Sequence, residues 1–336
     1  MNYMEITRGQ WIIIILLTLS FIATAGFIAF ATAAVLSFGP AYLYLKSIRN
    51  AEETDKEPWS ALQTVFIWGA VSGVFYALIL NSLGGSIVFL YSGNDADLTF
   101  ILTAIIVAPI VEEFVKPLVL FRNVSVKGEI DEVEDGIVYG AACGLGFGAT
   151  ENILYGLSEG AVSSGLLGVI IVVALRTVSS ILLHLTASSF TGYGISQYLV
   201  KGESFSVVVK YYLLAVLIHA AWNTAAVLGS SLILIFSILL AIGGLEFSKR
   251  RIRELDLEGS NIQPQSLRAE NNREDWWNAS KDKWANKSQT QTSNTASPIF
   301  ESGTESPASS MFQNIDWRQT LGGIFFLFYI LSSIIF

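Results

Sequence analysis

Apolar stretches long enough to cross a membrane recur through the first 247 residues of this chain. The hydrocarbon core of a bilayer is about 30 Å thick, and a helix needs about 20 apolar residues to cross it. The composition agrees, because 52% of the 336 residues are hydrophobic and only 14% are charged, which is outside the range of soluble domains. The sequence therefore predicts an all-α fold, a polytopic bundle of about seven or eight transmembrane helices in the cell membrane.

The predicted crossings lie mostly before residue 248, and a weaker candidate closes the chain. In order they are Trp11 to Leu36, Trp59 to Tyr91, Leu98 to Phe121, Ile137 to Leu157, Leu166 to Leu199, Tyr211 to Leu228, Leu232 to Phe247 and Leu321 to Phe336. The first apolar run is longer than the core of a secretory signal, so we expect an uncleaved anchor. The last would reach only about 24 Å as a helix, so re-entry or docking on the bundle is the alternative to spanning.

Lysine and arginine gather in alternate connecting segments, and such segments stay in the cytoplasm. The positive set is Lys46, Arg49 and Lys56, then Arg122 and Lys127, then Lys201 and Lys210, then Lys249, Arg250, Arg251 and Arg253. This pattern predicts that the N-terminus is outside and that the polar tail is inside. We divide the chain into a transmembrane bundle at 1–248, a polar, largely disordered cytoplasmic tail at 249–319 and a C-terminal apolar segment at 320–336, because the tail is too polar to bury a core.

Ionisable and amide side chains nevertheless occur inside four of the predicted spans. They are Glu112, Glu113, Lys116, Glu151, Asn152, Arg176, His184, His219 and Asn223. An ionisable group at bilayer depth costs at least about 2.5 kcal/mol, so a set of them indicates a functional site. Measured along their helices, the principal residues lie roughly 12 to 23 Å from the cytoplasmic ends of their spans, near enough to meet if the helices tilt or kink.

The third span places two adjacent carboxylates beside a lysine. Glu112 and Glu113 lie four and three residues before Lys116, so the lysine reaches back to either along one helix face. Pro109 and Pro117 flank the group, and each removes a helix hydrogen bond and favours a kink. A buried structural ion pair is the alternative to a functional site at this position.

The fourth span carries a stripe of small residues with a spacing of four: Gly136, Gly140, Gly144 and Gly148. Such a stripe allows a neighbouring helix to approach closely, so we interpret these glycines as a packing seam. Glu151 lies three residues beyond Gly148, and we expect its carboxylate to point toward the helix that packs there. The chain has a single cysteine, Cys143, which excludes an intramolecular disulfide and which we interpret as a small packing residue.

The fifth and sixth spans hold the two histidines of the chain, His184 and His219. An intramembrane histidine is often only hydrogen-bonded between helices. Two imidazoles with one carboxylate, however, make the ligand set of hydrolytic zinc sites, in which the metal activates a water. A second carboxylate can act as general base, and an amide or a guanidinium can stabilise an oxyanion. This inventory fits peptide-bond hydrolysis inside the membrane.

Four motifs in order give the chain a resemblance to the PrsW family of intramembrane proteases, distant relatives of the CAAX-processing and bacteriocin-processing membrane proteases. The matching residues are Glu112-Glu113-x-x-Lys116, Phe147-x-x-x-Glu151-Asn152, Arg176 with His184, and His219-x-x-x-Asn223. Pro40 and Glu57-Pro58-Trp59 also look like the family's opening. The resemblance covers about residues 36 to 230.

The resemblance implies a protease that cleaves a membrane-bound protein, in the best-known member an anti-sigma factor at the first step of a signalling cascade. Carried over by residue, Glu112, Glu113, Glu151, His184 and His219 look catalytic or metal-binding, with Lys116, Asn152, Arg176 and Asn223 in support. Our hypothesis assigns a divalent metal, with zinc as first choice, to His184, His219 and Glu151 or Glu113, and the general base to Glu112. In the distant relatives the mechanism is open, since a glutamate can activate water there without a metal.

Two other classes of function remain as alternatives. An ion-coupled transporter would use the same carboxylates and histidines to relay protons or to bind a cation. A catalytically silent relative would bind membrane partners and sequester them. For the protease we expect a membrane-anchored protein substrate and the lipid bilayer as partners, and no nucleic acid.

Overall fold

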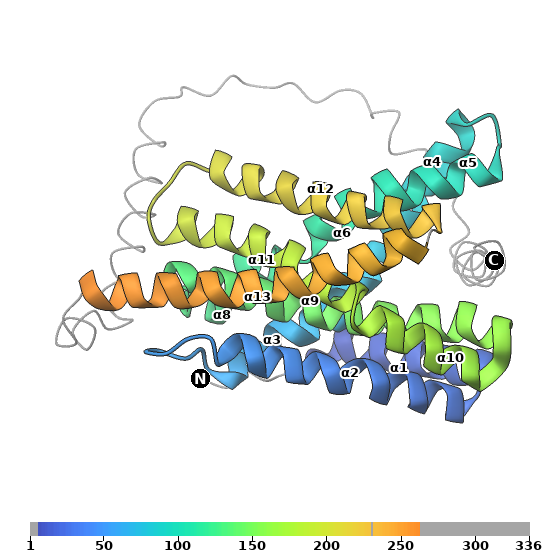
Figure 1. The fold of residues 1–336 in the computed structure, drawn as a ribbon, viewed down its shortest axis with the longest axis horizontal. Helices are drawn as coiled ribbons and strands as arrows, with labels where there is room; N and C mark the ends of the chain where they lie inside the picture. Colours follow the sequence, from blue (N-terminus) through green and yellow to red (C-terminus); the bar gives the residue numbers. More distant parts are fainter. Residues whose placement is uncertain (1–5, 230, 263–336) are drawn as a thin grey trace, which may run out of the picture. The chain divides into compact units, whose positions relative to one another are not determined.

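The computed structural model describes residues 6–229 and 231–262, and each regular element in these ranges is a helix (Figure 1). The predicted all-α fold is confirmed. The α-helices are α1 (Arg8–Ala25), α2 (Phe27–Arg49), α3 (Trp59–Ile67), α4 (Val74–Tyr91), α5 (Ala96–Leu102), α6 (Ala108–Val115), α7 (Leu118–Arg122), α8 (Val124–Gly128), α9 (Val133–Tyr155), α10 (Ala161–Thr177), α11 (Ser180–Leu199), α12 (Ser206–Leu228) and α13 (Ser231–Ile262). Three π-helical segments are η1 (Trp68–Gly73), η2 (Thr103–Val107) and η3 (Gly156–Gly160).

Six helical stretches in the described part are long and apolar enough to cross a membrane, which confirms a multi-pass membrane protein. They are Arg8–Ala25, Phe27–Arg49, Trp59–Tyr91, Ala96–Arg122, Ser163–Leu199 and Ser206–Leu228. The predicted fourth crossing, now α9, is not among them, because its glycines, Glu151 and Asn152 lower its hydropathy. The predicted crossing from Leu321 to Phe336 lies outside the described residues.

The first predicted crossing, Trp11 to Leu36, is two helices rather than one. The chain turns at Gly26, whose φ of 83° is a conformation that a residue with a side chain rarely adopts, and α1 and α2 then pack on each other. Two full crossings would put Thr7 on the same side as Arg49. The predicted outside location of the N-terminus therefore depends on whether α1 crosses fully, and it stays a prediction.

Three other predicted crossings are interrupted near the polar residues. The segment η1 divides the second one, and η2 precedes α6 in the third. Helix α6 ends at Val115 because Pro117 has no N–H to continue it, so both prolines mark breaks as the sequence predicts. Between α10 and α11 the helix breaks at Ser179, with φ −126° and ψ −77°. Interruptions of this kind frequently occur at functional sites.

Helix α9 runs through the middle of the bundle and packs most extensively against α11 (Figure 1). Its glycine stripe is the contact surface, as predicted. A Cβ built on Gly140 would lie 2.3 Å from the Ser188 carbonyl oxygen, and one on Gly144 would lie 2.2 Å from the His184 carbonyl oxygen. Only glycine permits this approach of two backbones, which sets the position of His184 relative to α9.

We expect Gly140→Ala to lower the thermal unfolding midpoint of the detergent-purified protein, because the new methyl group forces α9 and α11 apart. Overpacking of this kind costs about 1–3 kcal/mol. Gly39→Ala in α2 is the matched control, since no atom outside its own helix turn lies within 4 Å of the added carbon. Equal midpoints for the two variants would contradict the packing seam.

Helix α13 continues past Lys249, where we predicted the polar tail to begin, and ends at Ile262. Ile252 and Leu255 are buried against the bundle, and the Asp256 carboxylate accepts hydrogen bonds from the Glu53 and Thr54 amides. Residues 249–262 are therefore helical, because buried apolar side chains and the Asp256 contacts hold this charged segment against the bundle, and the division of the chain at residue 249 stays a prediction. The assignment of residues 263–319 as a disordered tail and of 320–336 as an apolar segment concerns residues that the structure does not describe.

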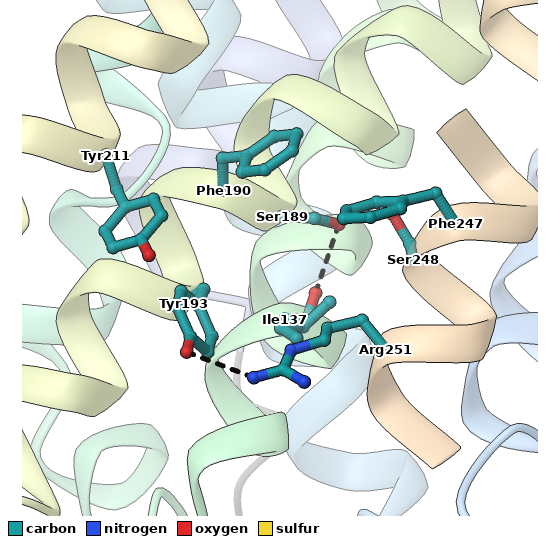
Figure 2. Close-up of a pocket in the computed structure, with 8 residues that line it drawn as sticks. All are labelled: Ile137, Ser189, Phe190, Tyr193, Tyr211, Phe247, Ser248 and Arg251. Atoms are coloured by element: carbon teal, nitrogen blue, oxygen red, sulfur yellow. Dashed lines mark hydrogen bonds between the residues drawn. The ribbon is translucent and has the colours of Figure 1, made fainter. Parts of the chain in front are cut away.

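A cavity of about 160 Å³ lies beside α13 (Figure 2). Half of its lining residues are aromatic, among them Tyr193, Tyr211 and Phe247, and the Arg251 guanidinium lies 3.5 Å from the Tyr193 hydroxyl. None of the predicted site residues lines it. The chemistry that the sequence predicts therefore does not depend on this cavity.

The loop between α2 and α3 holds two buried carboxyl groups, Glu52 and Glu57. Burial, together with repulsion from Glu57, raises the pKa of Glu52 to about 9, and burial raises the pKa of Glu57 to about 8. Both values are above the 4.5 of an ordinary glutamate. Between the ordinary pKa of 4.5 and these raised values, the native protein therefore binds more protons than the unfolded chain does.

In chelator-treated protein we expect the unfolding midpoint to fall as the pH rises from about 5 to about 9. A carboxyl group whose pKa is higher in the native state stabilises it below that range, and the contribution is lost as the group ionises. Glu52→Gln should flatten this decline and should be the more stable protein at the alkaline end. Parallel pH profiles for the two proteins would contradict a raised pKa at Glu52.

Candidate active site

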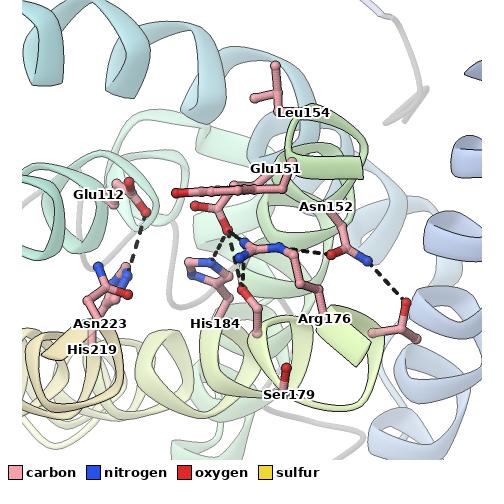
Figure 3. A network of polar contacts seen from close by, with 12 residues as sticks. Glu112, Glu151, Asn152, Leu154, Arg176, Ser179, His184, His219 and Asn223 are labelled. Carbon is pink, nitrogen blue, oxygen red and sulfur yellow. Dashed lines mark hydrogen bonds and ion pairs between the residues drawn. The ribbon is translucent and has the colours of Figure 1, made fainter. Parts of the chain in front are cut away.

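Four helices bring the predicted carboxylates and histidines together (Figure 3). Helix α6 carries Glu112 and Glu113, α9 carries Glu151, α11 carries His184 and α12 carries His219. The ring centroids of the two histidines are 4.9 Å apart, and both rings are buried. The convergence that the sequence predicts from depth alone is therefore present in the structure.

Glu113 forms the deepest part of this cluster. Its Oε1 pairs with Lys116 Nζ at 2.6 Å and accepts from His219 Nδ1 at 2.8 Å, and its Oε2 accepts from the Ser188 hydroxyl at 3.4 Å. The side chains of Glu113 and Lys116 have no exposed surface. Both oxygens of Glu113 are therefore occupied by protein groups, and Glu113 orients His219.

Lys116 also contacts His184 and an aromatic ring. Its Nζ lies 2.8 Å from His184 Nδ1 and 4.5 Å from the centre of the Phe147 ring. An ammonium can only donate, so Nδ1 accepts and the ring proton of His184 is on Nε2. The lysine therefore fixes the tautomer of His184 as well as the charge of Glu113.

Glu151 lies between His184 and Arg176 (Figure 3). Its Oε2 is 2.7 Å from Arg176 Nη2 and 2.8 Å from His184 Nε2. Arg176 Nε in turn donates to Asn152 Oδ1 at 3.1 Å. The Glu151 side chain is 17% exposed whereas that of Glu113 is fully buried. Glu151 is therefore the more accessible of these two carboxylates, and Arg176 favours its ionised form.

Asn152 fastens α9 to α10 at this point. Its amide nitrogen donates to the Val173 carbonyl at 3.1 Å and to the Thr177 hydroxyl at 3.0 Å. Asn223, the other predicted supporting amide, donates to the Ala104 carbonyl of η2 at 2.8 Å. This bond ties α12 to the π-helical segment that precedes the carboxylate pair.

Glu112 presents an unused oxygen to the two histidines. Its Oε1 accepts from Asn81 Nδ2 at 3.1 Å. Its Oε2 is buried, has no hydrogen-bond partner among residues 6–229 and 231–262, and lies 3.9 Å from His219 Nε2. His219 donates from Nδ1 to Glu113, so its Nε2 carries no proton. The lone pair on Nε2 is therefore available on the side of the ring where Glu112 Oε2 lies.

These atoms fit a metal ion. One ligand atom from each of Glu112, His184 and His219 lies within 4.8 Å of the other two. His219 has the arrangement that metal-binding histidines show, with a carboxylate on the opposite ring nitrogen. His184 would bind a metal through Nε2 as a neutral ring only with its proton on Nδ1. Metal binding would therefore release the Nε2 proton to solvent and shift one proton from Lys116 to Nδ1, 2.8 Å away, which leaves Glu151 ionised.

Sequence reasoning did not identify Asn81 of α4, which positions Glu112, or Ser188 of α11, which contacts Glu113. Asn81 is a lone amide that directly follows the apolar run Leu78-Ile79-Leu80. An isolated amide in an apolar span is the sequence feature that could have indicated its role. Ser188 has no such signal, because serine is common in transmembrane helices.

Comparison with known proteins agrees with the geometry. Residues 57–243 match the family model described as PrsW family intramembrane metalloprotease. Proteins named Protease PrsW are similar to this chain: that of Clostridioides difficile is 30% identical over 184 residues, which is 55% of this chain and 73% of the relative. That of Geobacillus kaustophilus is 34% identical over 119 residues, 35% of this chain and 47% of the relative. That of Bacillus subtilis is 32% identical over 127 residues, 35% of this chain and 49% of the relative.

The matched region spans about half the length of two of these relatives. No solved structure matches the chain.

Proposed function

The chain belongs to the PrsW family of intramembrane metalloproteases, and from that premise we propose that it is an endopeptidase that hydrolyses a peptide bond in a membrane-anchored protein. The observation that carries the proposal is the buried, unpartnered Glu112 Oε2 facing His219. Leaving such an atom unsatisfied is costly unless a bound group uses it.

We assign the metal-binding role to Glu112, His184 and His219. This differs from the hypothesis drawn from the sequence, in which Glu113 or Glu151 was the carboxylate ligand and Glu112 the base. Both oxygens of Glu113 already contact protein groups, whereas Glu112 Oε2 is unused. A divalent ion held there, with zinc as first choice, would activate water and polarise the peptide carbonyl.

Glu151 is then the general base. Arg176 favours its ionised form, and its partial exposure allows water and substrate to reach it. Glu113 and Lys116 act through the histidines: Glu113 holds His219 in the tautomer with a free Nε2, and Lys116 holds the position of His184. Asn152 positions Arg176, and Asn81 positions Glu112.

The substrate class follows from the location of the site. A peptide bond can reach Glu151 only if the substrate chain enters the bundle at membrane depth, which a protein with its own membrane-spanning segment does most readily. The resemblance to the family favours a membrane-anchored signalling protein, cleaved as a step of regulated proteolysis. The cell membrane itself is the environment of the reaction.

We expect Glu151→Gln to reduce cleavage by about 100-fold or more, because removal of a general base typically costs 10²–10⁴ in rate. The assay reconstitutes the purified full chain in liposomes with a panel of single-span reporter proteins and identifies fragments by mass spectrometry. Glu246→Gln is the matched control, since this carboxylate is 64% exposed and its ion pair among the described residues is with Lys249. Equal cleavage by wild type and Glu151→Gln would remove Glu151 from the mechanism.

Two outcomes would favour the other functions. Proton or cation flux through substrate-free liposomes, abolished in Glu151→Gln, would indicate an ion-coupled transporter. Unchanged partner binding and phenotype in a Glu112→Gln/Glu151→Gln double variant would indicate a silent binding protein.

A further inference from the structure

A second group of buried carboxylates lies at the predicted cytoplasmic end of the bundle. Glu52 and Glu57 belong to the loop between α2 and α3, and Asp135 lies in the first turn of α9. One carboxylate oxygen of each lies within 4.8 Å of those of the other two. The three residues are only 0%, 6% and 2% exposed, in that order. The proposed proteolytic mechanism uses none of them.

No basic side chain of the described residues forms a close ion pair with this group, although the charge of Arg49 acts on Glu52 from a greater distance. Within residues 6–229 and 231–262, no ion pair closer than 4.0 Å involves the carboxylates of Glu52, Glu57 or Asp135. Two basic side chains of the same segment bind backbone instead: Arg49 Nε donates to the Glu57 carbonyl at 2.6 Å, and Lys56 Nζ donates to the Glu52 carbonyl. Three buried acids without a closely paired basic group require protons or a cation.

Protein hydrogen bonds satisfy part of the group. Glu52 Oε2 accepts from the Glu57 amide at 3.0 Å, and Glu57 Oε2 accepts from the Tyr139 hydroxyl. Asp135 Oδ2 accepts from two backbone amides of the preceding turn at 2.6 and 2.9 Å. Glu57 and Asp135 are also hydrogen-bonded to each other through their side chains, so without a cation these two acids must share a proton.

Glu52 Oε1 is the atom that the protein leaves unused. It is buried, and no donor of the described residues reaches it. Its residue has no exposed surface, so solvent does not satisfy this oxygen from outside. A buried carboxylate oxygen in this state, beside two further acids, is the kind of ligand that hard divalent cations take.

We propose that Glu52, Glu57 and Asp135 bind a hard divalent cation, Ca²⁺ or Mg²⁺, which fastens the α2–α3 loop to the start of α9. Ca²⁺–oxygen bonds of about 2.3–2.6 Å allow ligand oxygens up to about 5 Å apart, and Mg²⁺ draws them closer. The loop leads directly into Trp59 of α3. The cation therefore anchors one side of the bundle that surrounds α9, and this role is independent of the proteolytic function.

The test uses full-length protein in detergent, stripped of metals with a chelator, and Tb³⁺ as the probe. Tb³⁺ bound to Glu57 lies beside Tyr139, whose ring sensitises its luminescence. We expect one saturable Tb³⁺ site that Ca²⁺ or Mg²⁺ displaces, and the ion that displaces at the lower concentration is the preferred one. The site should persist in the His219→Ala background, in which the proposed catalytic metal site has lost a ligand.

Glu52→Gln should weaken Tb³⁺ binding by about 10-fold or more, because loss of one charged ligand lowers the affinity of such sites strongly. Glu246→Gln removes an exposed carboxylate elsewhere and should bind as wild type does. The thermal unfolding midpoint provides the second measurement: Ca²⁺ or Mg²⁺ should raise it in wild type and in Glu246→Gln but not in Glu52→Gln. Asp135→Asn replaces Glu52→Gln if that variant does not fold.

Two results would overturn the proposal. One is wild-type protein without saturable Tb³⁺ luminescence at millimolar concentration. The other is Glu52→Gln or Asp135→Asn that binds Tb³⁺ as tightly as wild type. Either would mean that shared protons alone hold the three acids together.

Discussion

Replacement of His219 with alanine is expected to abolish cleavage of a membrane-anchored reporter, with a loss of at least about 10³-fold. The imidazole lies between the two carboxylates: its Nδ1 is 2.8 Å from Glu113 Oε1, and its Nε2 is 3.9 Å from the unused Glu112 Oε2. Its removal deletes a proposed metal ligand. The measurement is initial cleavage rate in liposomes, together with the unfolding midpoint.

Thr224→Ala is the control for this variant. Thr224 lies on the same helix, and its hydroxyl donates to the Ala220 carbonyl of its own helix, so cleavage should remain close to that of wild type. The Glu113–Lys116 pair is still present in His219→Ala, and we expect the fold to survive. Cleavage by His219→Ala within tenfold of wild type would exclude a catalytic or metal-binding role for this histidine.

Lys116→Met is expected to have the largest effect on stability, a loss of about 3–5 kcal/mol. The ammonium is fully buried and pairs with Glu113 at 2.6 Å, so its removal leaves a carboxylate in the interior without its counter-charge. Cleavage should be lost as well, because His184 Nδ1 loses its donor. Thermal unfolding in detergent and the liposome cleavage assay measure the two effects.

The double variant Lys116→Met/Glu113→Leu separates stability from activity. Replacing both members of a buried ion pair with apolar residues restores much of the lost stability, whereas activity should stay absent because His219 Nδ1 loses its acceptor. Lys249→Met serves as the surface control: its partner Glu246 is 64% exposed, and a pair open to solvent on one side contributes at most about 1 kcal/mol. Recovery of full activity in the double variant would contradict the positioning roles of Glu113 and Lys116.

The class of fold could be predicted from apolar runs alone, but the helix boundaries depend on features that such runs hide. Apolar residues continue on both sides of Gly26, so hydropathy does not reveal the turn there. The π-helical segments η1 and η2 have no compositional signal. Helix α13 extends to Ile262 because Asp256 accepts a hydrogen bond from the α2–α3 loop and Ile252 is buried. These contacts join residues that are far apart in the sequence, so the sequence alone does not reveal them.

The residues of the site could be predicted from the sequence because they are polar residues in apolar transmembrane spans. Which side chains they contact could not be predicted. Glu112 and Glu113 are adjacent and therefore point about 100° apart around the helix. Which of them faces the histidines depends on the rotation of α6, and the segment η2 before it changes that rotation. The sequence therefore identifies the carboxylate pair, whereas the structure shows that Glu113 contacts Lys116 and that Glu112 Oε2 is unused.

Metal content is the measurement that tests the proposed active site most directly, because it requires no knowledge of the substrate. Elemental mass spectrometry of detergent-purified wild type should find about one tightly held zinc or other transition metal per chain, and the His184→Ala/His219→Ala variant should have lost it. A correctly folded wild type without such a metal, or a double variant that retains it, would contradict the assignment of Glu112, His184 and His219 as its ligands.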